Sequence, residues 1–145
     1  MAYPFNVRVY GILINENKQV LLSDEILRGG HYTKFPGGGL HFGEGTRQCL
    51  EREFMEELGI NVYIEEHIYT TDFFQRSQFA EDEQVISVYY RVKFENTEIE
   101  ALRLKPFEFE GLEQVFRWFN LENLTENDLS FPIDKIVLPL IKTLV

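Results

Sequence analysis

Three glutamates, Glu53, Glu56 and Glu57, lie close together in one segment of the chain. If this segment is helical, their spacing of i, i+3 and i+4 places the carboxylates on one helix face. Like charges so placed repel by about 1 kcal/mol per pair at about 4 Å in water, and by more near a low-dielectric surface. A divalent cation with a preference for oxygen ligands relieves this repulsion. The pattern predicts a Mg²⁺ site, with Mn²⁺ as the alternative ion.

A glycine run, Pro36-Gly37-Gly38-Gly39, lies upstream of the glutamates. Glycine has no side chain, so the main chain in this run can approach a bound ion or ligand closely. A backbone carbonyl from the run can therefore complete the coordination shell of an ion held by the glutamates.

The glycine run and the glutamates are parts of one longer pattern that spans 23 of the 145 residues, from Gly38 to Ile60. The pattern reads G, five of any residue, E, seven of any residue, R-E, hydrophobic, any, E-E, any, G, hydrophobic. Its fixed positions are filled by Gly38, Glu44, Arg52, Glu53, Phe54, Glu56, Glu57, Gly59 and Ile60. The segment is similar to the Nudix box, and the chain resembles the Nudix hydrolases.

The resemblance assigns roles to box residues. It implies that Glu53, Glu56 and Glu57 bind the metal, with the Gly38 carbonyl as a helper. The predicted catalytic residues are Glu53, Arg52, Glu57 and Glu44; Arg52 is expected to orient an acidic residue by an ion pair, and Glu44 to support the loop.

The reaction implied by the resemblance is attack of a metal-activated water on a phosphorus of a diphosphate bridge. The expected substrate is a small nucleoside diphosphate linked to another moiety. The general base is open between Glu53 and either Glu110 or Glu113, because the latter two precede a Trp-containing segment similar to the strand that closes many Nudix domains. The number of metal ions is open too.

The same residues fit other functions less well. The glutamates could form a plain solvated acidic face, but the complete box argues against this. A non-catalytic Nudix-type module that binds a nucleotide sugar or regulates a partner is the alternative function, although such a module need not keep all three glutamates. An isomerase of allylic diphosphates would require a dedicated catalytic cysteine, and the sole cysteine, Cys49, is expected to be a buried packing residue.

No residue outside the box identifies the substrate. Gln75 to Gln78 show neither the proline associated with ADP-ribose hydrolases nor the tyrosine associated with dinucleoside polyphosphate hydrolases, and no coenzyme A signature precedes the box. For the basic residues Lys34, Arg28 and Arg76, a solubilising role is favoured over phosphate contact.

The expected fold is α/β, specifically the Nudix α/β/α sandwich around a mixed β-sheet. A helix over Thr46 to Leu58 should be capped by Thr46, end at a left-handed Gly59 and bury Leu50, Phe54 and Leu58, with Cys49 and Met55 beside them. The other expected elements are two strands around Val7–Ile14 and Val20–Leu22 joined by a tight turn, a loop with at most one short strand over Ile26–Gly45, strands within Asn61–Phe74, Gln84–Phe94 and Val115–Phe119, and a helix over Ile133–Leu144 that Pro132 opens and Pro139 interrupts.

Composition limits the class of protein further. The length fits one domain over residues 1–145, and a net charge of −10 disfavours stable binding to long nucleic acid. No apolar run approaches the roughly 18 to 20 residues that cross a bilayer, which excludes a membrane span. With a lone cysteine and no signal segment, the expected location is the cytoplasm. Homodimers are common among the proteins it resembles.

Overall fold

The computed structural model describes residues 2–94 and 113–145 of the chain. Along the sequence its elements are β1 (Phe5–Leu13), β2 (Gln19–Leu27), β3 (Gly30–Lys34), β4 (Gly37–Gly39), α1 (Thr46–Leu58), β5 (Val62–Thr70), β6 (Gln84–Phe94), β7 (Gln114–Asn120), the short 3₁₀ turns η2 (Leu121–Asn123) and η3 (Glu126–Asp128), and α2 (Pro132–Lys142). None of the described helices combines the length and the apolar character needed to cross a bilayer.

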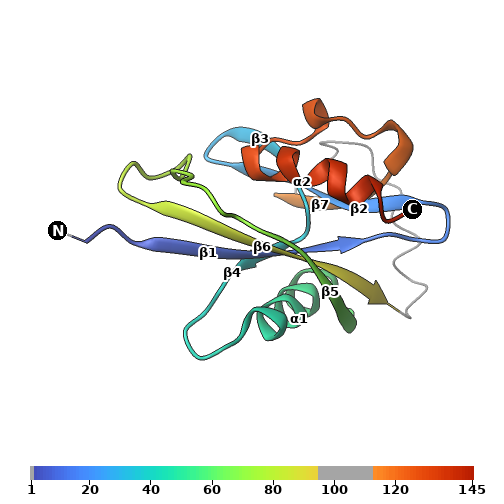
Figure 1. The fold of residues 1–145 in the computed structure, drawn as a ribbon, viewed down its shortest axis with the longest axis horizontal. Helices are drawn as coiled ribbons and strands as arrows, with labels where there is room; N and C mark the ends of the chain where they lie inside the picture. The colour runs from blue at the N-terminus through green and yellow to red at the C-terminus, as the bar shows by residue number, and fades with distance from the viewer. Residues whose placement is uncertain (1, 95–112) are drawn as a thin grey trace.

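The strands form two sheets, one of four strands in the order β4-β1-β6-β5 and one of three in the order β3-β2-β7. The four-stranded sheet is mixed, because β1 runs parallel to β6 while its other pairs are antiparallel. Figure 1 shows α1 on one side of this sheet and α2 on the other. The predicted α/β/α sandwich around a mixed sheet is confirmed.

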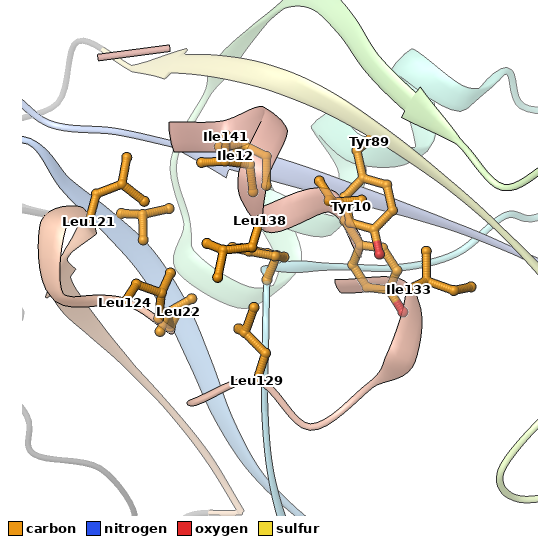
Figure 2. Packing of buried hydrophobic residues seen from close by; sticks show 13 residues of the cluster. Tyr10, Ile12, Leu22, Tyr89, Leu121, Leu124, Leu129, Ile133, Leu138 and Ile141 are labelled. Carbon is orange, nitrogen blue, oxygen red and sulfur yellow. The ribbon is translucent and has the colours of Figure 1, made fainter. Parts of the chain in front are cut away.

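Alternation along β1 builds a separate core on each side of the sheet. Val9 packs toward α1, in a cluster with Leu50 and Phe54. Tyr10 and Ile12 point the opposite way, since successive strand side chains face opposite sides of a sheet. They pack with Tyr89 of β6 against the buried face of α2, as Figure 2 shows; the residues of α2 in this cluster are Ile133, Val137, Leu138 and Ile141.

Helix α1 has the bounds predicted from the sequence, but its start differs. The N-cap is Gly45, whose N–H donates to the Gln48 side chain at 2.8 Å. The expected cap, Thr46, is wrong because its hydroxyl is hydrogen-bonded to the Tyr90 hydroxyl at 2.6 Å. At the other end Gly59 has φ 68°, the left-handed conformation that was expected.

The predicted packing of α1 holds for Leu50, Phe54 and Cys49, whereas Leu58 is only partly buried and Met55 is exposed. Leu50 and Phe54 are buried, and Cys49 is fully buried as expected of a packing residue. Burial raises the pKa of the Cys49 thiol to about 12. Met55 is 44% exposed, because it lies about 100° around the helix from Phe54 and so outside the buried stripe.

The predicted pair of strands joined by a tight turn is confirmed: β1 and β2 follow one another across a hydrogen-bonded turn, although the two strands lie in different sheets. Two other expectations need correction. The stretch expected to be mostly loop contains both β3 and β4, because the glycines of β4 can pair closely with β1. Pro139 does not end the last helix; it occupies an exposed position of α2, which continues to Lys142.

Candidate active site

The carboxylate of Glu53 is packed directly against the main chain of the glycine run. Glu53 is 9% exposed, and a Cβ atom added to Gly38 would lie 2.4 Å from the Glu53 Cδ atom. No side chain at position 38 can coexist with this arrangement, since Cβ contacts under 3.0 Å essentially never occur. The glycine therefore makes room for a carboxylate beside its own backbone.

Arg52 ties the loop of the box to the helix. Its Nε and Nη2 atoms donate to the two carboxylate oxygens of Glu44 at 3.0 and 2.7 Å, and Nη2 also donates to the Gly39 carbonyl at 3.0 Å. Its Nη1 donates to Glu53 at 2.9 Å and to Glu56 at 3.2 Å. One guanidinium thus holds three carboxylates and the end of the glycine run.

Glu44 closes the loop from the other side. Its Oε1 accepts a hydrogen bond from the His41 backbone N–H at 2.9 Å. The hydrogen bonds from Arg52 hold the pKa of the Glu44 carboxyl at about 2, so it is ionised throughout the neutral range. These contacts fix the loop that joins β4 to α1.

Glu57 lies in a different environment. It is half-buried, and that burial raises the pKa of its carboxyl to about 7, with the charge of Glu53 adding to the rise and that of Lys34 opposing it. A nearby divalent cation would offset the loss of hydration that this carboxylate suffers.

The three glutamates share one face of α1 but do not converge in the structure. Among residues 2–94 and 113–145, no group of three or more His, Cys, Asp or Glu side chains is arranged as a metal site. Glu53 and Glu56 instead each form an ion pair with Arg52. The donor set nevertheless suits magnesium, because it consists of carboxylate oxygens beside a glycine main chain. Metal binding by Glu53, Glu56, Glu57 and the Gly38 carbonyl stays a prediction.

A cavity of about 410 Å³ is lined by residues of β1, β2 and β6, the end of β3, the loop before β6 and the start of α2. Lys34 lines it and is only 3% exposed. Its ammonium makes an ion pair with Glu25 at 2.9 Å. The solubilising role expected for Lys34 is therefore wrong, whereas Arg28 and Arg76 are exposed.

Comparisons with known proteins decide the family. A sequence model of the NUDIX domain matches residues 4–141. The chain belongs to the Nudix family. Two curated relatives are RNA pyrophosphohydrolases. The protein of Acinetobacter baylyi is 44% identical over 64 residues, which cover 44% of this chain and 36% of that protein. The protein of Blochmanniella pennsylvanica is 38% identical over 61 residues, which cover 41% of this chain and 36% of that protein. The match thus spans 36% of the length of either relative.

Solved structures show the same fold. The solution structure of the E. coli ORF135 protein has a TM-score of 0.71 and 21% sequence identity, and the match covers 97% of this chain and 90% of that one. At this identity the likeness establishes the Nudix fold alone.

Of the two residues proposed as a general base outside the Nudix box, the structure describes Glu113 alone. Glu113 is exposed just before β7, and its backbone carbonyl accepts a hydrogen bond from Ile26 N–H. The adjacent Gln114, not singled out in the sequence, donates to Ser23 at 2.8 Å and to Glu25 at 3.2 Å. Glu110 lies outside the described residues.

Asp134 is a buried acid that lines the cavity, and no motif in the sequence marks it. It is 2% exposed, and its Oδ1 accepts a hydrogen bond from the Tyr89 hydroxyl. Its Oδ2 is buried with no hydrogen-bond partner among the described residues. Burial raises the pKa of the Asp134 carboxyl to about 6, against the opposing hydrogen bond from Tyr89.

This raised pKa predicts how stability depends on pH. Between about pH 4 and pH 6 the folded chain keeps the Asp134 proton while the unfolded chain has lost it, so stability falls as pH rises through this window. The loss is on the order of 3 kcal/mol, because two pKa units correspond to about that energy. In urea unfolding at pH 4, 5, 6 and 7, the free energy of unfolding of Asp134→Asn should rise relative to that of the unaltered chain as the pH increases across the window. A stability difference that does not change with pH would contradict this assignment.

Proposed function

We propose that this Nudix domain is a pyrophosphohydrolase that depends on Mg²⁺ or Mn²⁺ and cleaves a diphosphate linkage in a small nucleotide-like molecule. The observation that carries the proposal is the folded Nudix box: Glu53 is seated on Gly38, and Arg52 binds the acids on both sides of the loop. The two RNA pyrophosphohydrolase relatives support this class of reaction.

The box residues divide the work. When bound, a magnesium ion would supply an activated water and positive charge beside the phosphate that leaves. Glu53, Glu56 and Glu57 would hold the metal, with the carbonyl of Gly38 beside them. Arg52 positions Glu53 through the 2.9 Å ion pair. Its ion pair with Glu44 fixes the position of the glycine run relative to the helix, and this keeps Glu53 packed against Gly38.

The cavity supports a small substrate. Its volume of about 410 Å³ falls in the range of pockets that bury a small ligand, which is roughly 300 to 1,000 Å³. A net charge of −10 opposes contact with a long phosphate backbone. The relatives' names nevertheless make the 5′ end of an RNA a substrate to compare with free nucleotides.

The test is a substrate panel assayed with Mg²⁺, with Mn²⁺ and with EDTA. It contains nucleoside triphosphates, nucleoside diphosphates linked to a sugar or a second nucleoside, and a short RNA with a 5′-triphosphate. Release of phosphate, pyrophosphate and nucleoside monophosphate is measured. We expect turnover of at least one compound with metal and none in EDTA. Saturable binding without turnover of any compound would instead favour the non-catalytic binding module.

Glu57→Gln provides the matched variant. Glutamine keeps the shape of the half-buried side chain but cannot carry the negative charge that a metal ligand needs. We expect metal-dependent turnover to be lost and the circular dichroism spectrum to be unchanged. Full activity in Glu57→Gln would refute the role assigned to this residue.

A further inference from the structure

The cavity is lined by four cationic side chains, and these differ in the ion pairs and hydrogen bonds that they already form. They are Arg8, Arg28, Lys34 and Arg76. A cation that binds a substrate phosphate must have donors left over for it, so the contacts of each side chain identify the candidate.

Three of the four are engaged by other groups. The ammonium of Lys34 pairs with Glu25 at 2.9 Å. Arg28 is exposed, stacks on Phe79 with its Cζ 5.1 Å from the ring centre, and donates to the Phe79 carbonyl at 3.1 Å. Arg76 is also exposed and donates to a main-chain carbonyl, that of Glu81, at 2.7 Å.

Arg8 differs from the other three. It is partly buried, and its only hydrogen bond to another described residue runs from Nε to the Tyr10 hydroxyl at 3.2 Å. It forms no ion pair with any residue in 2–94 or 113–145. The bond from Nε fixes the plane of the guanidinium and leaves its two terminal nitrogens for a ligand. The carboxylates of Glu53 and Glu25 attract this charge from a distance, but neither forms an ion pair with it, so an anionic ligand can bind the free nitrogens.

The position of Arg8 connects the cavity to the predicted metal ligands. In the pairing of β1 with β4, Arg8 lies opposite Gly39. A Cβ added to Gly39 would lie 3.4 Å from Nη1 of Arg8, whereas a Cβ added to Gly38 would meet Glu53. Successive residues of a strand face opposite sides, so Glu53 and Arg8 flank the same two glycines from the two faces of β4. Arg8 is therefore the cationic residue of the cavity lining that also lies next to the glycine run of the box.

We propose that Arg8 is a substrate-binding residue whose two terminal nitrogens hold the phosphate chain where the cavity meets the Nudix box. A guanidinium presents parallel N–H groups that match two phosphate oxygens, and such charge-assisted pairs are the strong hydrogen bonds of proteins. Tyr10 orients the fork through Nε. The proposal rests on the proposed function for the identity of the ligand, and it adds the protein group that recognises the phosphates independently of the metal.

The test compares Arg8→Gln and Arg8→Lys with Arg47→Gln, which removes an exposed arginine that does not line the cavity. Binding of inorganic pyrophosphate is measured by calorimetry in Mg²⁺ and again in EDTA, so the result does not depend on turnover. We expect Arg8→Gln to weaken binding at least about tenfold in both conditions, since hydrogen bonds to charged groups contribute on that scale. Arg8→Lys should keep part of the affinity, and Arg47→Gln should match the unaltered chain.

Kinetics on whichever compound the panel identifies supply a second measurement. Arg8→Gln should raise KM at least about tenfold with a smaller change in kcat, because the contact exists before the bond breaks. Pyrophosphate affinity equal in Arg8→Gln and the unaltered chain, or no pyrophosphate binding by the unaltered chain in either condition, would overturn the proposal. Arg8-dependent binding in a chain that turns over no substrate would support it while refuting the proposed hydrolase.

Discussion

Glu53→Gln should lower kcat/KM at least about 100-fold and weaken Mg²⁺ binding while the chain stays folded. Groups that only orient a metal ligand typically cost 10- to 100-fold when removed, so a ligand itself should cost no less. Glu53 also has the best-defined position of the three acids, seated on Gly38 and bonded to Arg52 at 2.9 Å. Steady-state kinetics on the substrate found in the panel, with a Mg²⁺ titration, measures both effects.

Glu51→Gln is the matched control, because Glu51 lies on the same helix and is exposed. It removes the same charge from α1 but should leave kcat/KM and Mg²⁺ affinity within about twofold. If both variants lost activity equally, the loss would come from the changed net charge of the helix and not from the position of Glu53. A loss below about tenfold in Glu53→Gln would rule out a direct ligand at this position.

The box helix is the part of the site that spacing alone could predict. The carboxylates of Glu53, Glu56 and Glu57 share a face because a helix fixes its own periodicity, and the bounds of α1 follow from the glycines on either side. The same local reasoning does not give side-chain directions. Arg52 draws Glu53 and Glu56 toward itself, so a shared face is not the same as a converged metal site.

The cavity could not be predicted, because its charged residues come from separate strands and a helix. Arg8 is on β1, Lys34 ends β3 and Asp134 is in the first turn of α2. Nothing in their spacing relates them, and a charged residue is more often exposed than buried. Only the packing of both sheets against α2 reveals that Lys34 and Asp134 are buried.

Asp24 and Arg117 form a buried ion pair that belongs to no sequence motif. Breaking this pair is expected to have the largest effect on stability. Asp24 of β2 is fully buried and accepts from Arg117 of β7 at 2.7 Å and from the Thr33 hydroxyl of β3 at 2.6 Å. It thus links all three strands of the smaller sheet. Asp24→Ala would leave the Arg117 guanidinium, 6% exposed, without its counter-ion.

We expect Asp24→Ala to lower the free energy of unfolding by about 3 to 5 kcal/mol, the usual cost of breaking one partner out of a buried ion pair. For a chain of this size that lowers Tm by roughly 10 °C. Removing both charges, in Asp24→Leu combined with Arg117→Met, should recover more than half of the loss, because no buried charge is then left unpaired. Urea and thermal unfolding measure both variants. Equal destabilisation by the single and double changes would show that the strands need the ion pair itself. A loss below about 1 kcal/mol in Asp24→Ala would mean that water reaches Arg117 once Asp24 is gone.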